Sequence, residues 1–236
     1  MQPKKIWGAL QKYMNNTCEK ESCWIRHQCI KNNINISKME KMFAPKSPKI
    51  WKDNPREWLS TLDIHNVMKQ WEECDKTFRF LGASPLDYDK KLIYGECVWD
   101  DLCRFSLKRE IDNKIRKIGV VFNLDIHTKP GSHWVACYID INKKKIYFFD
   151  SYGDPPPNRI MKFCKDVKKQ GSKLGKKYDI IINTTRYQHS NGECGMFSMY
   201  FIIQLLKGVD YNKLNADMLS DTNMSKFRKK FFNIPK

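Results

Sequence analysis

The chain contains the stretch Gln188-His189-Ser190-Asn191-Gly192-Glu193-Cys194-Gly195, and an apolar run of residues 196–206 follows it directly. A run of this length and composition predicts a buried helix, with Cys194 at its N-terminus. The positive end of a helix dipole favours thiolate over thiol. Cys194 is therefore the candidate nucleophile, although a single cysteine in such a position is also a common small buried residue.

Gln188 precedes Cys194 on a loop to which Gly192 and Gly195 give conformational freedom. If this loop bends back, the side-chain amide of Gln188 and the backbone N–H of Cys194 point at one spot. Two donors aimed at one position are what an oxyanion hole requires. The stretch therefore predicts a nucleophile together with an oxyanion donor.

A thiolate nucleophile needs a histidine base and a third group that orients it. His133 opens a predicted strand at residues 134–141, a polar turn follows, and a second strand at residues 146–149 ends at Asp150. An antiparallel hairpin would make His133 and Asp150 neighbours. His127 and His189 remain rival bases, and Asp150 has the alternative role of capping its own turn.

In chain order, His133-Trp134, Asp150-Ser151, Gln188 and Cys194-Gly195 resemble the cysteine peptidases typified by adenovirus protease and the SUMO-deconjugating enzymes. Further matching segments make the chain most similar to the maturation proteases of large cytoplasmic DNA viruses, of the African swine fever virus and mimivirus type. Those segments are residues 58–64, 80–87, 121–125 and 150–153. The resemblance covers most of the chain from about residue 50 onward.

The resemblance implies a thiol protease with an adenain-like core and four catalytic roles: His133 as base, Asp150 as its orienting acid, Gln188 as oxyanion donor and Cys194 as nucleophile. It also implies that Trp58 and Trp134 flank a narrow tunnel for the glycines that precede the scissile bond. Indole faces close together would exclude residues that carry a Cβ. A core anchor is the alternative role for Trp58.

The function implied by this resemblance is cleavage of structural polyprotein precursors after Gly-Gly during virion maturation. It would take place in the host cytoplasm, at the viral factory, and in the virion. The alternative is a SUMO or ubiquitin-like isopeptidase of the same fold. Ser60-Thr61 stands where the deconjugating enzymes have a polar-acidic pair, which favours polyprotein substrates.

Length and composition bound these hypotheses. The chain has 236 residues, of which 41% are hydrophobic, enough for a substantial core. Nine cysteines are scattered irregularly, and no signal peptide precedes them, which indicates a reducing compartment and a fold without disulfides. No apolar run has the length needed to cross a bilayer. We expect neither a metal nor an organic cofactor at the site.

The chain carries a formal charge of +17, from 43 basic and 26 acidic residues. Two interpretations stay open. A solvated lysine surface is one, and nonspecific contact with DNA or acidic proteins is the other. No zinc-finger framework or RNA-binding motif indicates specific recognition of nucleic acid.

The pattern of elements predicts an α+β fold, with a central and mostly antiparallel sheet flanked by helices. We expect an N-terminal helical arm at residues 1–48 and the protease core at residues 49–236, divided at the prolines of residues 44–49. The arm should contain two helices, with Cys18, Cys23, His27 and Cys29 between them. These four have the residue types of a zinc site but not its spacing, so core packing is the preferred interpretation.

Within the core we expect strands at residues 118–123, 134–141, 146–149 and 178–183. Helices are expected from the Trp58 segment to about residue 73, and at residues 102–117, 158–169 and 196–206. One or two further helices should follow in residues 210–236. A surface ion pair between Asp221 and Arg228 is predicted there.

Overall fold

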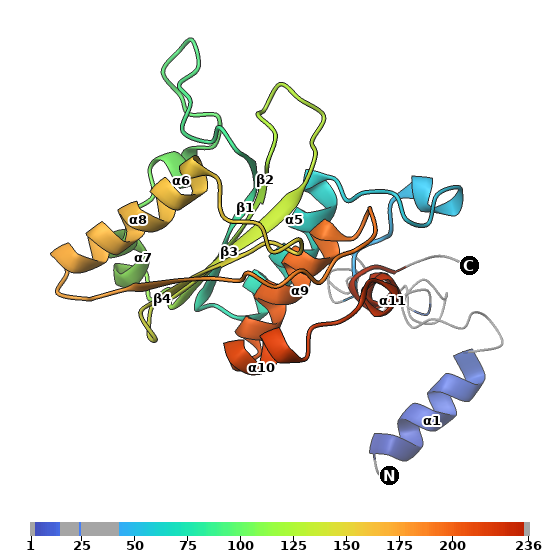
Figure 1. Ribbon diagram of the computed structural model, residues 1–236. Coiled ribbons are helices and arrows are strands. Elements are labelled where there is room, and N and C mark those ends of the chain that lie inside the picture. The colour runs from blue at the N-terminus through green and yellow to red at the C-terminus, as the bar shows by residue number, and fades with distance from the viewer. Residues whose placement is uncertain (1–2, 15–23, 25–42, 234–236) are drawn as a thin grey trace. The chain divides into compact units, whose positions relative to one another are not determined.

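The computed structural model describes residues 3–14, 24 and 43–233 (Figure 1). The chain divides into two compact units, one from Pro48 to Arg228 and one formed by the residues before and after it. The smaller unit contains α1 (Pro3–Met14), as predicted, and a bridge between Lys46 and Asn233. The second predicted arm helix and the set Cys18, Cys23, His27 and Cys29 lie outside the described residues.

Five strands form one mixed sheet in the order β1-β2-β3-β4-β5. Their bounds are β1 Phe78–Pro85, β2 Lys117–Asn123, β3 Trp134–Asp140, β4 Lys145–Phe149 and β5 Asp179–Ile182. The two central pairings, β2 with β3 and β3 with β4, are antiparallel, whereas the outer pairings of β1 and β5 are parallel. The structure thus confirms the predicted α+β class and antiparallel centre.

Helices cover both faces of the sheet (Figure 1). Alternate residues of β2, β3 and β4 form a buried cluster with Ile160, Phe163 and Val167 of α8 (Asn158–Lys173). On the opposite face, Phe149 stacks on Phe201 of α9 (Cys194–Leu206) at a centroid distance of 4.5 Å. A register slip of one residue would exchange these two sets, so burial on both faces fixes the register.

The remaining elements flank this core. They are η1 (Lys49–Lys52), α5 (Thr61–Cys74), α6 (Asp100–Cys103), α7 (Leu107–Asp112), α10 (Tyr211–Ala216) and α11 (Asp221–Phe231). Ser60 caps α5 by accepting from the backbone N–H of Asp63, whose carboxylate accepts from the backbone N–H of Ser60 in return. In the part of the chain that the structure describes, no helix has the length and apolar character to span a membrane.

The single helix predicted at residues 102–117 is wrong, because α6 and α7 are separate and β2 has already begun at Lys117. Ser106 caps α7, and the side chain of Gln170 binds the backbone between the two helices. Lys114 then takes a positive φ of 63°. Strand β1 was not predicted either, because Gly82 and Pro85 interrupt its pattern.

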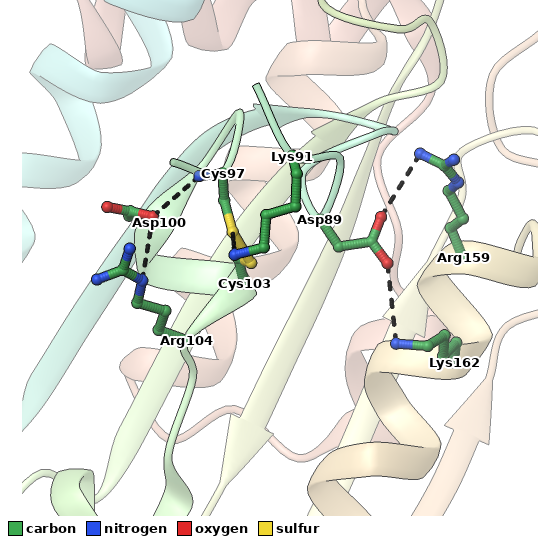
Figure 2. Close-up of a disulfide and its surroundings, with 8 residues drawn as sticks. All are labelled: Asp89, Lys91, Cys97, Asp100, Cys103, Arg104, Arg159 and Lys162. Atoms are coloured by element: carbon green, nitrogen blue, oxygen red, sulfur yellow. Dashed lines mark hydrogen bonds and ion pairs between the residues drawn. A yellow bond between two sulfur atoms is a disulfide. The ribbon is translucent and has the colours of Figure 1, made fainter. Parts of the chain in front are cut away.

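The expectation of a fold without disulfides is also wrong, because Cys97 and Cys103 form one (Figure 2). Cys103 is the last residue of α6, and Cys97 precedes that helix, so the turn between them brings their Cα atoms to 6.2 Å. Such a separation is within the usual range for a disulfide. The irregular spacing of the nine cysteines did not indicate this pairing.

Candidate active site

Cys194 is the first residue of α9, and the structure buries it to 4% exposure. The hydroxyl of Ser198, one turn further along α9, donates to the backbone oxygen of Trp134 at 3.1 Å. This bond fastens the start of α9 to the start of β3, where His133 lies. The helix is apolar on all sides because it packs between the sheet and its neighbouring helices. The buried core therefore positions the thiol.

His133 and Asp150 meet as the hairpin predicts, since His133 immediately precedes β3 and Asp150 immediately follows β4. The Nε2 atom of His133 lies 2.6 Å from Oδ1 of Asp150. The same carboxylate oxygen accepts from the backbone N–H of Tyr152 at 2.8 Å. With Nε2 committed to Asp150, Nδ1 is the ring nitrogen left for Cys194.

Burial acts to lower the pKa of His133, but hydrogen bonds with Asp150 and Cys194, together with the negative charge of each, raise it to about 9. The imidazole therefore keeps its proton at neutral pH. A protonated imidazole beside a cysteine at a helix N-terminus stabilises the thiolate. This arrangement can provide a nucleophile and an acid for the leaving group in one ion pair.

Asn183, which was not among the predicted site residues, fixes the backbone at Asp150. Its Oδ1 accepts from the N–H of Asp150 at 2.8 Å, and its Nδ2 donates to the oxygen of Asp150 at 2.8 Å and to that of Thr185 at 3.0 Å. Asn183 is 1% exposed, so these bonds stand in place of water. A polar residue directly after the apolar residues of a predicted strand was the one signal that could have identified it.

Gln188 is also buried, and its side-chain amide is held at both ends. Oε1 accepts from the hydroxyl of Ser151 at 2.7 Å, and Nε2 donates to the oxygen of Ser190 at 2.6 Å. The backbone N–H of Gln188 donates to the oxygen of Ser151 at 2.9 Å. Residue Ser151 follows Asp150 directly, so one turn orients both the carboxylate and the amide.

A buried ion pair braces the loop in front of Cys194. Arg228 donates through Nε to both carboxylate oxygens of Glu193 and through its other nitrogens to the backbone oxygens of Glu57 and Gly192. The predicted pair of Arg228 with Asp221 is therefore wrong. Asp221 instead accepts from the backbone N–H groups of His189 and Ser190.

Replacing Glu193 by alanine should destabilise the protein by about 3–5 kcal/mol, because it leaves the buried charge of Arg228 without its partner. Urea unfolding followed by circular dichroism measures this loss of unfolding free energy. Glu73, an exposed glutamate of α5, provides the matched control. The Glu73→Ala change should stay within about 0.5 kcal/mol of the parent protein. Equal losses in the two variants would contradict the role of the ion pair.

The segment 56–59 lies directly against the nucleophile loop. Gly192 has a φ of +107°, and a Cβ there would lie 2.8 Å from the backbone oxygen of Arg56. A Cβ on Gly195 would lie 3.1 Å from Leu59 and 3.2 Å from Trp134. The indole N–H of Trp134 donates to the oxygen of Leu59 at 2.9 Å. Glycine at these two positions therefore permits the close packing.

Trp58 and Trp134 both line a cleft of about 860 Å³. Trp134 is 6% exposed, whereas Trp58 is 44% exposed. Ring atoms of Trp58 lie 3.8–3.9 Å from the Cβ position of Gly192, and Trp134 lies against Gly195. The two indoles thus line the cleft and also lie against the nucleophile loop. The exposure of Trp58 does not fit a role as core anchor.

The two rival histidines have other surroundings. Nδ1 of His127 lies 2.7 Å from the buried carboxylate of Asp87, and His127 lines the cleft. Burial acts to raise the pKa of Asp87, but hydrogen bonds with His127 hold it below its usual value. His189 is exposed. Among the described residues, no group of three or more metal-binding side chains comes together.

Comparison with known proteins connects this geometry to a family. Residues 109–234, more than half of the chain, match the family model described as the Ulp1 protease family, C-terminal catalytic domain. A protein named as a thiol protease from Acanthamoeba polyphaga mimivirus is 36% identical over 75% of this chain. The match covers 57% of that relative's length. A SUMO-1 cysteine protease of African swine fever virus is 27% identical, over 98% of this chain and 89% of the relative.

Solved structures agree on the fold. The selenomethionine crystal structure of the African swine fever virus protease is 25% identical and gives a TM-score of 0.72, over 98% of this chain and 89% of that one. The yeast Ulp1 protease domain, solved in complex with the SUMO orthologue Smt3, gives a TM-score of 0.54 at 21% identity over 75% of each chain. Together with the family match, these findings show that the chain belongs to the Ulp1 protease family and is a cysteine-type peptidase.

Proposed function

We propose that the protein is a viral endopeptidase that cleaves structural polyprotein precursors after Gly-Gly during virion maturation, in the host cytoplasm and in the virion. The observation that carries this proposal is the 4% exposure of Cys194, which lies between Gly192, packed near Trp58, and Gly195, packed against Trp134. A thiol so enclosed is accessible to a thin, extended peptide. Glycine, which has no Cβ, fits such a passage, and larger residues are excluded.

The proposed mechanism uses the four residues in fixed roles. Cys194 attacks the carbonyl carbon as a thiolate, and His133 gives its proton to the leaving amine. Asp150 accepts from Nε2 of His133 and so keeps Nδ1 directed at the thiolate. The scissile C–N bond breaks, a thioester forms, and water activated by His133 hydrolyses it. Each step uses only groups of this chain and water.

Gln188 and the backbone N–H of Cys194 are the proposed oxyanion donors. A primary amide has two N–H bonds, and the oxygen of Ser190 takes one from Gln188. The second remains for the oxyanion. The first N–H groups of a helix lack partners within it, and Cys194 is the first residue of α9. Two donors of this kind stabilise a tetrahedral intermediate.

Replacing Gln188 by alanine should lower kcat about 10²–10³-fold and change KM little, because the lost donor acts mainly in the transition state. Steady-state cleavage of a fluorogenic Gly-Gly peptide measures this. The Ser151→Ala variant is the matched comparison, because it removes the bond to Oε1 but keeps the amide donor. The loss of kcat in Ser151→Ala should be smaller than in Gln188→Ala. A Gln188→Ala variant that keeps more than a tenth of the parental kcat would contradict the role.

The second candidate function is removal of SUMO or a ubiquitin-like protein from its conjugates. Two of the comparisons favour it: the African swine fever virus relative named as a SUMO-1 cysteine protease, and the Ulp1 domain solved in complex with Smt3. The same site would act on an isopeptide bond. Ser60-Thr61, however, stands where the deconjugating enzymes have a polar-acidic pair, so this pair offers no carboxylate to such a substrate. The Ser60 hydroxyl instead caps α5 by accepting from the backbone N–H of Asp63.

A substrate panel separates the two candidates. It contains Gly-Gly-X peptides, Ala-Ala-X peptides of equal length, and ubiquitin and SUMO conjugates, each treated with the parent protein and with Cys194→Ala. Thiol-dependent cleavage of Gly-Gly-X, but not of Ala-Ala-X, supports the endopeptidase. Cleavage of conjugates alone moves the assignment to an isopeptidase. Cleavage of neither would overturn both.

We also propose that the basic residues of the protein make nonspecific contacts with DNA or acidic proteins. A formal charge of +17 attracts polyanions through counterion release, which weakens steeply as salt rises. Binding of a random-sequence duplex, followed by fluorescence anisotropy across a salt series, tests the proposal. Affinity that does not depend on salt would contradict it.

A further inference from the structure

Tyr152 separates His133 from Arg186. The rings of His133 and Tyr152 are stacked, with centroids 4.5 Å apart and planes within 5° of parallel. The guanidinium of Arg186 lies over the Tyr152 ring at 4.9 Å. Tyr152 is therefore in contact with both the base and an exposed cation. A guanidinium over an aromatic face is a stable arrangement with its own geometric preference.

Hydrogen bonds hold both Tyr152 and Arg186 in this stack. The N–H of Tyr152 donates to the carboxylate of Asp150, which also binds His133. Nε of Arg186 donates to the backbone oxygen of Gln188 at 2.9 Å. Arg186 is thus positioned by the same loop that holds the oxyanion glutamine. The stack is part of the site, although neither Tyr152 nor Arg186 has a role in the mechanism above.

The chemistry of the proposed reaction determines which part of the substrate lies next to Tyr152 and Arg186. His133 must protonate the leaving amine, so the residue after the scissile bond leaves beside the imidazole. The residues before the bond lie toward Trp58 and Trp134, at the cleft. Tyr152 covers the imidazole, and Arg186 extends beyond Tyr152 into solvent. The leaving side of the substrate therefore meets Arg186.

Arg186 has donors left for this substrate. A guanidinium has five N–H bonds in a planar fork, and the bond to Gln188 uses the one on Nε. Asp221, the nearby acid, already accepts from the backbone N–H groups of His189 and Ser190. Asp150 is occupied by His133 and Tyr152. A carboxylate from the substrate is the group that matches the outer face of Arg186.

We propose that Tyr152 and Arg186 form the subsite for the residue that follows the scissile bond, and that Arg186 gives this subsite a preference for acidic side chains. The inference rests on the proposed endopeptidase function and specifies its substrate class. An exposed ion pair of this kind changes affinity by about two- to fivefold. The preference should weaken as salt rises, because the pair is exposed.

The test compares kcat/KM for two peptides that differ only after Gly-Gly, one with Asp and one with the isosteric Asn. The parent protein should favour Asp by about two- to fivefold at low salt. Arg186→Gln should bring the ratio close to one, and Arg186→Lys should retain part of it because the charge remains. Arg159, exposed on α8, provides the control, and Arg159→Gln should keep the parental ratio.

A parental ratio near one, or a ratio that survives in Arg186→Gln, would overturn the subsite while leaving the endopeptidase function intact. Failure to cleave any Gly-Gly peptide would instead overturn the proposed function. In that case, binding of the same two peptides to the Cys194→Ala protein, measured by fluorescence anisotropy, still decides the subsite. Tighter binding of the Asp peptide that Arg186→Gln removes supports it, and equal binding overturns it.

Discussion

Replacing Cys194 by alanine is expected to abolish peptide cleavage, with a loss of kcat on the order of 10⁶-fold. Cys194 is the thiol that raises the pKa of His133, and it stands at the start of α9. Without it, no covalent intermediate can form, and the remaining oxyanion donors retain only a small part of the acceleration. Cleavage of a fluorogenic Gly-Gly peptide, at enzyme concentrations high enough to detect such a residual rate, measures the effect.

The structure supplies a matched control for general loss of a thiol. Cys74 is a free, exposed cysteine at the end of α5. We expect the Cys74→Ala variant to cleave the peptide at the parental rate, and we expect iodoacetamide still to inhibit this cleavage. The buried pair Cys137 and Cys164 should not react, because their mutual hydrogen bond and burial raise the pKa of Cys137. Thiol-sensitive cleavage that persists in Cys194→Ala would place the nucleophile elsewhere.

The meeting of His133 and Asp150 could be predicted from the sequence because it depends on local rules. A polar turn between two apolar strands dictates an antiparallel hairpin, and such a hairpin places the residue before one strand beside the residue after the other. The structure has this arrangement, with Ala136 paired to Phe149. The helix that begins at Cys194 is equally local, since its continuous apolar run has no other stable environment.

The brace of Glu193 and Arg228 could not be predicted in this way. Its two residues come from different elements, and only the packing of α11 near the nucleophile loop brings them together. From sequence, Asp221 was an equally good partner for Arg228. A helix presents many charged residues, and which of them becomes buried depends on tertiary structure. The stack of Tyr152 on His133 is likewise set by packing, because periodicity carries no information on ring orientation.

The fold of residues 75–117 could not be predicted from the sequence for the same reason, because it depends on tertiary packing. Strand β1 pairs with β2 in parallel, and the register shifts between Phe80 and Ala83. Gly82, with a φ of +105°, lies within this irregularity, and the ring of Trp99 occupies the space where a Cβ would be. A glycine that breaks the strand pattern in sequence thus serves close packing in the fold. Its role becomes visible only when Trp99 is in place.

Replacing Asp150 by alanine is expected to lower kcat/KM on the order of 10⁴-fold, because His133 loses both its orienting partner and a charge that favours the imidazolium. The backbone around position 150 should hold, because Asn183 binds its N–H and oxygen rather than its side chain. Asp150→Asn should lose less. The N–H of Tyr152 donates to Oδ1 of Asp150, so it would orient the asparagine oxygen toward His133.

The pH dependence of kcat/KM separates two roles of Asp150: it orients the His133 ring, and its negative charge raises the pKa of His133. The pKa of His133 is raised to about 9, so in the parent protein the active imidazolium form is present below that value and is lost as pH rises through it. Asp150→Asn removes the negative charge that raises this pKa but leaves the burial that lowers it. The alkaline limb of kcat/KM should therefore move to lower pH. Asp154→Asn, an exposed change in the same turn, should leave the limb in place. If Asp150→Asn also leaves it near 9, the charge of Asp150 does not set the protonation of His133, and Cys194 alone must hold the imidazolium.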